Sequence, residues 1–192
     1  MKHPASAAGL HFRAACPDDT HAIVRLHADS WQRHYRGAFS DAFLHNEAVG
    51  YLLPLWNERL AIPDPQARTI LAEREGEVVG LAHTLLRQDP RWGAFLDNLH
   101  IAYGMKRQGI GTRLLALTAQ AVLDGESSSG LYLWVLEQNG DARAFYAAQG
   151  GACVERAEVP PPGGDAGRLN GRPMGLRYAW PDLSVLAGRT IR

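Results

Sequence analysis

The chain carries the sequence Leu96-Asp97-Asn98-Leu99-His100-Ile101 and, after a short linker, Lys106-Arg107-Gln108-Gly109-Ile110-Gly111-Thr112-Arg113-Leu114-Leu115. This pattern predicts a strand, a glycine-rich turn and a helix that begins at about Thr112. Two glycines one residue apart let the backbone approach a ligand closely, and the first amides of a helix have no partner within it. Such amides favour an anion, and Lys106 and Arg107 add positive charge. The segment therefore predicts a binding site for phosphate groups.

Two familiar glycine motifs do not describe this segment. No Gly-Lys-Ser/Thr follows the glycines, which excludes the loop that binds nucleoside triphosphates. No third glycine stands at the position that the dinucleotide-binding fold requires. The alternative reading of the glycine pair is a plain helix start.

Composition limits the class of protein. The chain has 192 residues, of which 46% are hydrophobic, which fits one domain with a full-sized core. Lys plus Arg and Asp plus Glu both number 20, so no excess charge favours nucleic acid or a membrane surface. Cys16 and Cys153 lack metal-ligand spacing and are expected to be reduced thiols, with a disulfide as the alternative. No apolar run reaches membrane-spanning length, and we expect a cytoplasmic protein without a metal site.

Hydrophobic periodicity and turn residues divide the chain into alternating elements. We predict strands over residues 12–15, 69–74, 77–86, 95–101, 131–135, 152–159 and 173–178. We predict helices after Pro17-Asp18-Asp19-Thr20, over residues 41–60 with a kink or break at Pro54, from residue 112 to about 124, and from Asn139 to Gly150. The continuous apolar run at residues 131–135 indicates a strand covered on both faces, in the interior of the sheet.

The order of these motifs resembles the GNAT family of N-acetyltransferases. A strand is followed by Lys106-x-x-Gly109-x-Gly111, an amphipathic helix, a strand, Asn139 and then Phe145-Tyr146. The family signature is Arg/Gln-x-x-Gly-x-Gly/Ala, and the resemblance runs from about Phe12 to Tyr178. Lys106 stands where the family prefers Arg or Gln, so the bidentate fork of arginine is lost. Arg107 stands where a glycine is common.

The resemblance implies an α/β fold of the α+β type. In this GNAT fold about four helices flank a single central, mixed, mostly antiparallel sheet of six to seven strands. Two neighbouring parallel strands splay apart. The acetyltransferase domain would cover residues 12–180, between a flexible N-terminus over residues 1–11 and a C-terminal tail over residues 181–192.

The resemblance also implies that acetyl-CoA is the co-substrate. Its pantetheine arm would pair with the strand at about residues 97–101, and Asn139 would touch that arm or simply cap a helix. The residues expected to bind acetyl-CoA are Leu99, His100, Ile101, Lys106, Arg107, Gln108, Gly109, Ile110, Gly111, Thr112, Asn139, Ala142, Phe145 and Tyr146.

Transfer of an acyl group from a thioester to an amine needs a proton for the leaving thiolate. A phenol with a pKa near ~10 can protonate a thiolate whose conjugate acid has a pKa near ~8.5. Tyr146 stands at the family's tyrosine position and is the candidate general acid. Its alternative role is that of a core tyrosine.

The base that takes the proton of the amine is less well defined. Many relatives carry a Glu early in the central strand, and the matching residue here is Phe95, which cannot act as a base. Asp97 and His100 are the ionisable candidates, and a bound water is a third. The oxyanion would be stabilised by a backbone N–H near residues 99–101.

The acceptor side rests on the resemblance alone. Trp31, His34 and Tyr35 fall where the family's first helices line the substrate cleft, although Trp and Tyr at this spacing are commonly core residues. His11, His21, His27 and His45 show no metal spacing and need no role. The expected function is N-acetylation of a small-molecule or protein amine, with a non-catalytic CoA-binding module as the alternative. Homodimers are frequent among the proteins that the chain resembles.

Overall fold

A computed structural model of the protein describes residues 9–125 and 130–188. The elements, in chain order, are β1 (Leu10–Ala14), α1 (Thr20–His34), α2 (Ala48–Ala61), β2 (Ala67–Arg74), β3 (Glu77–Asp89), β4 (Gly93–Ile101), α3 (Ile110–Gly125), β5 (Leu131–Leu136), α4 (Gly140–Ala148), β6 (Ala152–Glu158), β7 (Met174–Trp180) and α5 (Ser184–Ala187). None of the helices in these two ranges is long and apolar enough to cross a membrane.

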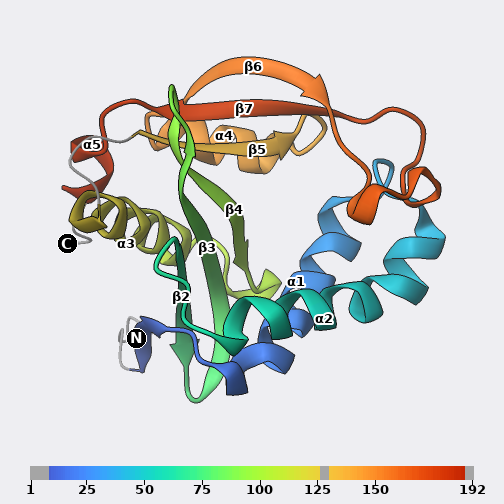
Figure 1. The fold of residues 1–192 in the computed structure, drawn as a ribbon, viewed down its shortest axis with the longest axis horizontal. Helices are drawn as coiled ribbons and strands as arrows, with labels where there is room; N and C mark the ends of the chain where they lie inside the picture. The colour runs from blue at the N-terminus through green and yellow to red at the C-terminus, as the bar shows by residue number, and fades with distance from the viewer. Residues whose placement is uncertain (1–8, 126–129, 189–192) are drawn as a thin grey trace, which may run out of the picture.

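The strands form one seven-stranded sheet in the order β1-β2-β3-β4-β5-β7-β6 (Figure 1). All neighbouring strands are antiparallel except β4 and β5, which are parallel. The fold class predicted from the sequence is therefore confirmed, with five α-helices among the described residues. The apolar strand β5 lies in the interior of the sheet, as predicted.

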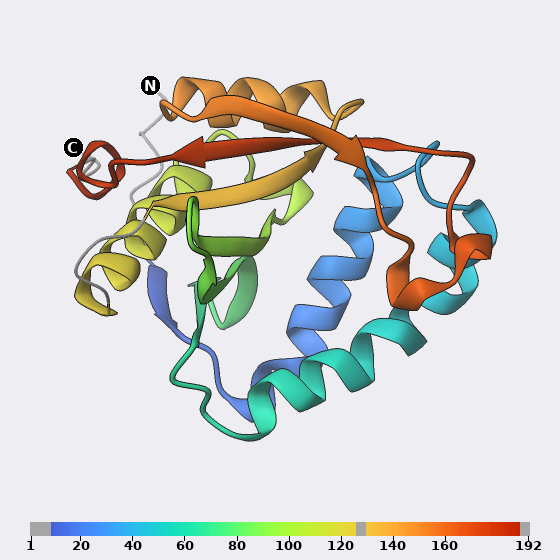
Figure 2. The same ribbon diagram turned by 45° about the horizontal axis from the view of Figure 1, so that its top comes forward.

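Each face of the sheet is covered by a separate hydrophobic core. Successive residues of a strand point to opposite faces. Leu81 of β3 belongs to the core under α1 and α2, whereas its neighbour Ala82 belongs to the core that includes Leu114 of α3 and Tyr146 of α4. Figures 1 and 2 both show α1 and α2 beside each other near the end of β4, with α3 and α5 at the opposite end of the molecule.

The helix predicted over residues 41–60 is present, but its irregularity lies elsewhere than expected. The helix continues through Pro54, and the irregular part is a π-helical turn at Phe43–Glu47. Proline removes one hydrogen bond from a helix, and packing can compensate for that loss. Leu52 and Trp56, on either side of Pro54, are fully buried and anchor this part of the helix in the core.

The two ends of the domain extend further than predicted. Strand β1 begins at Leu10, within the segment 1–11 that we expected to be flexible, and residues 1–8 lie outside the described residues. At the other end, Leu183 and Leu186 are buried in the core beneath α3, because α5 folds back onto that helix. Residues 189–192 of the predicted tail lie outside the described residues.

Candidate active site

The parallel strands β4 and β5 are paired only at their beginnings. Ala94 lies opposite Leu131 and Phe95 lies opposite Tyr132, after which the two strands separate (Figure 1). The rings of Phe95 and Tyr132 stack at 5.1 Å on this last pair. Beyond it, one edge of β4 has no pairing with β5, so its backbone N–H and C=O groups remain available to a ligand. The splayed parallel pair predicted from the sequence is present.

A β-bulge at Asp97 determines which side chains of β4 face which core. Asn98 lies opposite His83, whereas Leu96 lies opposite Thr84, so Asp97 has no partner on β3. One extra residue moves all later side chains to the other face of a strand. Leu96 therefore packs in the core of α3, whereas Asn98 and His100 line a cavity on the side of α1 and α2.

The glycine-rich segment forms a tight loop ahead of α3. Arg107 and Gly109 have φ angles of +62° and +80°. This left-handed conformation favours glycine, so Arg107 adopts a backbone geometry that is uncommon for a residue with a side chain. Gln108 of the same loop accepts a hydrogen bond of 2.8 Å from Arg74 of β2. The loop is thus fixed to the sheet.

The first amides of α3 are free. The N–H of Arg113 donates to the carbonyl of Gly109, and within the described ranges no acceptor is found for the N–H groups of Ile110, Gly111 and Thr112. Gly80 of β3 lets this end of α3 approach the sheet, since a Cβ there would lie 3.0 Å from side-chain atoms of Ile110 and Leu114. Three unpaired amides at a helix N-terminus can hold an anionic group.

Residues predicted to bind the cofactor from three different elements meet at this helix start. A Cβ on Gly111 would lie 3.4 Å from the ring of Phe145 in α4 and 3.8 Å from Ile101 of β4. Asn139 begins α4 by accepting a hydrogen bond of 3.2 Å from the N–H of Ala142, so the capping role considered for Asn139 is present.

Tyr146 follows Phe145 in α4 and is buried. Its ring lies 6.0 Å from Tyr178 and 6.2 Å from Trp180. Burial, and secondarily the nearby Tyr35, raise the pKa of Tyr146 well above its usual value near ~10. The phenol therefore keeps its proton at any physiological pH.

The cavity on the other side of β4 measures about 230 Å³. It is lined by side chains from α1, α2, β4 and the loop between β6 and β7: His27, Trp31, Tyr35, Tyr51, Leu55, Arg59, Asp97, Asn98, His100 and Pro162. Trp31 and Tyr35 of the predicted acceptor site are among them. His34 is not, because Nζ of Lys106 lies 2.8 Å from its Nε2 and holds it beside the glycine-rich loop.

His100 is held in a buried pair of histidines. Its Nδ1 lies 2.9 Å from Oγ of Ser30, and its ring lies 4.4 Å from that of His27. Nδ1 of His27 accepts a hydrogen bond of 3.1 Å from Nε1 of Trp56. Burial, followed by the charge of His34, lowers the pKa of His100 to about 4. The near-neutral pKa that made His100 a candidate base is therefore lost, and His100 is an uncharged lining residue.

Asp97, the second candidate base, is held by two donors. Arg59 of α2 forms an ion pair with Oδ2 at 2.8 Å, and Nδ2 of Asn98 donates to the same oxygen at 2.6 Å. Its negative charge helps to raise the pKa of Tyr35 to about 12, after burial as the larger cause. Asp97 thus carries a neutralised charge at the wall of the cavity.

Sequence reasoning missed part of this cavity. Arg59, Tyr51, Leu55 and Pro162 were not singled out, and His27 was given no role, although it stacks on His100. His27, Trp31 and Tyr35 follow one another at intervals of four residues in the sequence. This spacing places them on one face of a helix, and it could have pointed to His27.

Strand β4 thus has a glycine-rich loop and a helix start with unpaired amides beyond its end, a free backbone edge facing β5 and a lined cavity on its other side. This arrangement fits a transferase that holds an extended anionic cofactor and a second substrate. The sequence model of a protein family, described as the acetyltransferase (GNAT) family, matches residues 11–150. The chain therefore belongs to the GNAT family of acetyltransferases. It is an N-acetyltransferase with acetyl-CoA as co-substrate.

Similar proteins extend over most of the chain. YuaI of Bacillus subtilis, an uncharacterized N-acetyltransferase, is 26% identical over 176 residues, which are 91% of this chain and 94% of YuaI. Rv2775 of Mycobacterium tuberculosis, described as a probable N-acetyltransferase, is 29% identical over 143 residues, covering 71% and 76% of the two chains.

Solved structures share the fold at lower identity. The PaiA N-acetyltransferase of Thermoplasma acidophilum, solved in complex with coenzyme A, superposes with a TM-score of 0.64 at 16% identity, covering 89% of this chain and 99% of PaiA. A GCN5-related N-acetyltransferase from Rhodopseudomonas palustris superposes with a TM-score of 0.67 at 18% identity, covering 94% and 100%.

Proposed function

We propose that the protein transfers the acetyl group of acetyl-CoA to a primary amine by direct attack within a ternary complex. The observation that carries this proposal is the bulge at Asp97. It turns His100 toward the cavity, while the end of the β4–β5 pairing at Phe95 leaves one edge of the same strand open to the cofactor. An amine in the cavity and a thioester beside β4 then share one strand as their common wall, which brings the reactants together.

The cofactor would lie along the splayed edge of β4. Its diphosphate would accept hydrogen bonds from the free amides at the start of α3, with Lys106 adding positive charge. The pantetheine arm would pair with the backbone of Leu99 and Ile101, and α4 with Phe145 would cover it from the other side. The residues present therefore fit the cofactor that the family uses.

The chemical step forms a C–N bond and breaks the C–S bond of the thioester. The amine nitrogen attacks the carbonyl carbon, and a backbone N–H of β4 near residues 99–101 stabilises the oxyanion. As the C–S bond breaks, the nitrogen releases one proton to solvent and becomes the amide, while the leaving thiolate takes the proton of Tyr146 and becomes the free thiol of CoA. The Tyr146 phenolate then recovers a proton from solvent, so no net proton is gained or lost. Burial raises the pKa of Tyr146, so its phenol stays protonated and can donate a hydrogen bond to the sulfur as the C–S bond breaks.

The amine has to lose its own proton before it attacks. His100, whose pKa falls to about 4, is too weak a base for an alkyl ammonium with a pKa near ~10.4. Asp97 is already engaged by Arg59 and Asn98. The amine therefore enters as its neutral fraction or gives its proton to water, and His100 acts as an uncharged hydrogen-bonding group.

A CoA-binding module without catalysis is the second candidate. Phe95, at the position of the Glu that many relatives use, stacks on Tyr132 and offers no base. Such a module would bind acetyl-CoA but would release no thiol with any amine.

The cytoplasmic location and the homodimer expected from the sequence remain predictions.

The deciding experiment measures thiol release from acetyl-CoA with a panel of primary amines. Tyr146→Phe should lower kcat roughly ten- to a thousandfold, with little change in the Kd for acetyl-CoA. Tyr178→Phe removes a hydroxyl from the same aromatic cluster and should keep the wild-type rate. Full activity of Tyr146→Phe would refute the general-acid role, and binding without thiol release by the wild type would refute the enzyme.

A further inference from the structure

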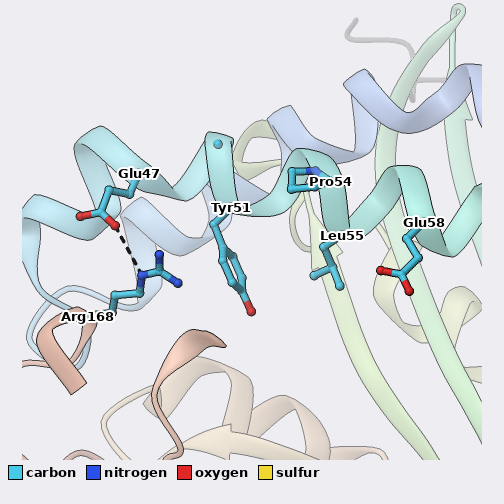
Figure 3. A pocket seen from close by; sticks show the side chains of 7 residues that line it. Glu47, Tyr51, Pro54, Leu55, Glu58 and Arg168 are labelled. Atoms are coloured by element: carbon cyan, nitrogen blue, oxygen red, sulfur yellow. Dashed lines mark ion pairs between the residues drawn. The ribbon is translucent and has the colours of Figure 1, made fainter. Parts of the chain in front are cut away.

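A second, outer cavity adjoins the one described above. It measures about 610 Å³ and is lined by Glu47, Gly50, Tyr51, Pro54, Leu55, Glu58 and Arg168. Tyr51 and Leu55 line both cavities, so the two adjoin beneath α2, and we refer to them together as the groove. Figure 3 shows Glu47, Tyr51, Leu55 and Glu58 projecting from the same side of the helix.

The positive charge of the outer cavity is neutralised by its own neighbours. Nε of Arg168 lies 3.4 Å from a carboxylate oxygen of Glu47 and 3.8 Å from one of Asp165, and its Nη1 donates to the carbonyl of Pro162 at 3.2 Å. Its guanidinium also lies 5.0 Å from the ring centre of Tyr51. The charge of Arg168 is therefore offset by two nearby carboxylates, although its buried Nε makes no hydrogen bond within the described residues.

Arg59, the cation of the inner cavity, is engaged in the same way. It pairs with Asp97 at 2.8 Å and lies 5.1 Å above the ring of Trp56. Its Nη1 is buried and has no hydrogen-bond partner within residues 9–125 and 130–188, so it presents no accessible donor to a ligand. The charge of each guanidinium group in the groove is therefore offset by a carboxylate of the protein.

Glu58 is the carboxylate that remains. Its side chain is exposed and points into the groove (Figure 3), and among the residues that the structure describes it has no ion-pair partner. Leu55, which borders the inner cavity, precedes Glu58 by three residues, a rise of about 4.5 Å along a helix. The unpaired charge therefore lies about one helical turn from the mouth of the inner cavity.

We propose that the acceptor is a linear amine that carries a second positive charge, such as a diamine. This proposal rests on the proposed function and names the substrate class of the same site. The reacting amine enters the inner cavity beside His100, and the alkyl chain lies against Tyr51 and Leu55. The distal ammonium group pairs with Glu58, at the distance that a few methylene groups span.

The test compares three acceptors of the same chain length. They are 1,5-diaminopentane, pentylamine and 5-aminopentanoate, whose distal groups are an ammonium, a methyl and a carboxylate. At about pH 8 the distal amine stays mostly protonated, because its pKa is near ~10. We expect kcat/KM for thiol release to be highest for the diamine and lowest for 5-aminopentanoate. The value for the diamine is halved because either of its two ends can react, and it should then exceed that of pentylamine by at least about fivefold.

Glu58→Gln should raise KM for the diamine about three- to tenfold and leave pentylamine unchanged. Glu77→Gln removes the same charge at the exposed start of β3, away from the groove, and should keep the wild-type preference. Equal kcat/KM for diamine and monoamine in the wild type, or an unchanged preference in Glu58→Gln, would overturn the diamine proposal while leaving amine acetylation intact. Absence of thiol release with all three acceptors, alongside release with another amine of the panel, would overturn the diamine proposal alone; absence of release across the whole panel would overturn the proposed function.

Discussion

Nζ of Lys106 lies 2.8 Å from Nε2 of His34, the last residue of α1. This contact joins the glycine-rich loop to the helix that lines the inner cavity through His27, Trp31 and Tyr35. Since Lys106 can only donate, His34 accepts at Nε2 and is uncharged in this state. Burial, then the charge of Lys106, lower the pKa of His34 below its usual value.

Binding of a diphosphate should raise the pKa of His34, because the anion offsets the charge of Lys106. Proton uptake then accompanies binding, and affinity should rise as pH falls from about 7.5 to about 5.5. The other charges near His34 are Arg33, Asp29 and Asp141, and they remain in place. Calorimetry with dephospho-CoA measures this effect without the 3′-phosphate, which itself titrates near pH ~6.

His34→Gln keeps an acceptor for Lys106 but does not titrate. The variant should bind dephospho-CoA with an affinity that is nearly constant over the same pH range. An equal pH dependence in wild type and variant would show that His34 is not linked to cofactor binding.

At position 111, CoA binding should tolerate alanine but not valine. A single Cβ would meet Phe145 at 3.4 Å, an ordinary contact, so Gly111→Ala should bind CoA nearly as well as wild type. The additional methyl groups of Gly111→Val should displace Phe145 or cover the free amides, and weaken CoA and acetyl-CoA alike by roughly tenfold or more. Gly104→Ala is the matched control, since a Cβ there meets nothing within 4 Å. Unchanged affinity in Gly111→Val would remove the phosphate-binding assignment.

The pH dependence of the rate tests the absence of a histidine base. With a pKa of about 4, His100 does not titrate near neutrality, so no limb is expected at pH ~6.5. At subsaturating amine, the rate should climb smoothly toward the pKa of the amine itself in wild type, His100→Asn and Asp97→Asn. A limb near pH ~6.5 that disappears only in His100→Asn would restore His100 as the base, and one that disappears only in Asp97→Asn would assign the role to Asp97.

The buried histidines should make the fold sensitive to acid. Burial lowers the pKa of His83 to about 3 and that of His100 to about 4, so the unfolded chain binds protons more readily. Their contribution to stability is complete above the unfolded pKa near ~6.5 and is lost as pH falls toward the folded values. At pH ~5 each of these two histidines should lower the free energy of unfolding by about 2 kcal/mol relative to neutral pH. Urea unfolding at the two pH values measures this loss, and His83→Gln should reduce it. An equal loss in the variant would contradict the role of His83.

The local patterns of the sequence determined the order of the elements and the cofactor loop. Gly109 and Gly111 after an apolar strand indicate the turn into α3, and the apolar run at residues 131–135 indicates an interior strand, because both signals depend on nearest neighbours in the chain. The resemblance added the splay between β4 and β5, and the structure shows that it begins after Phe95, whose ring stacks on Tyr132.

Tertiary structure alone decided the acceptor side. The bulge at Asp97 exists only in the pairing of β4 with β3, and it reverses the faces of Asn98 and His100. The contacts of Arg59 with Asp97 and of Lys106 with His34 join residues 38 and 72 positions apart in the sequence. Such contacts arise from the packing of α1 and α2 against the sheet, which no local pattern encodes.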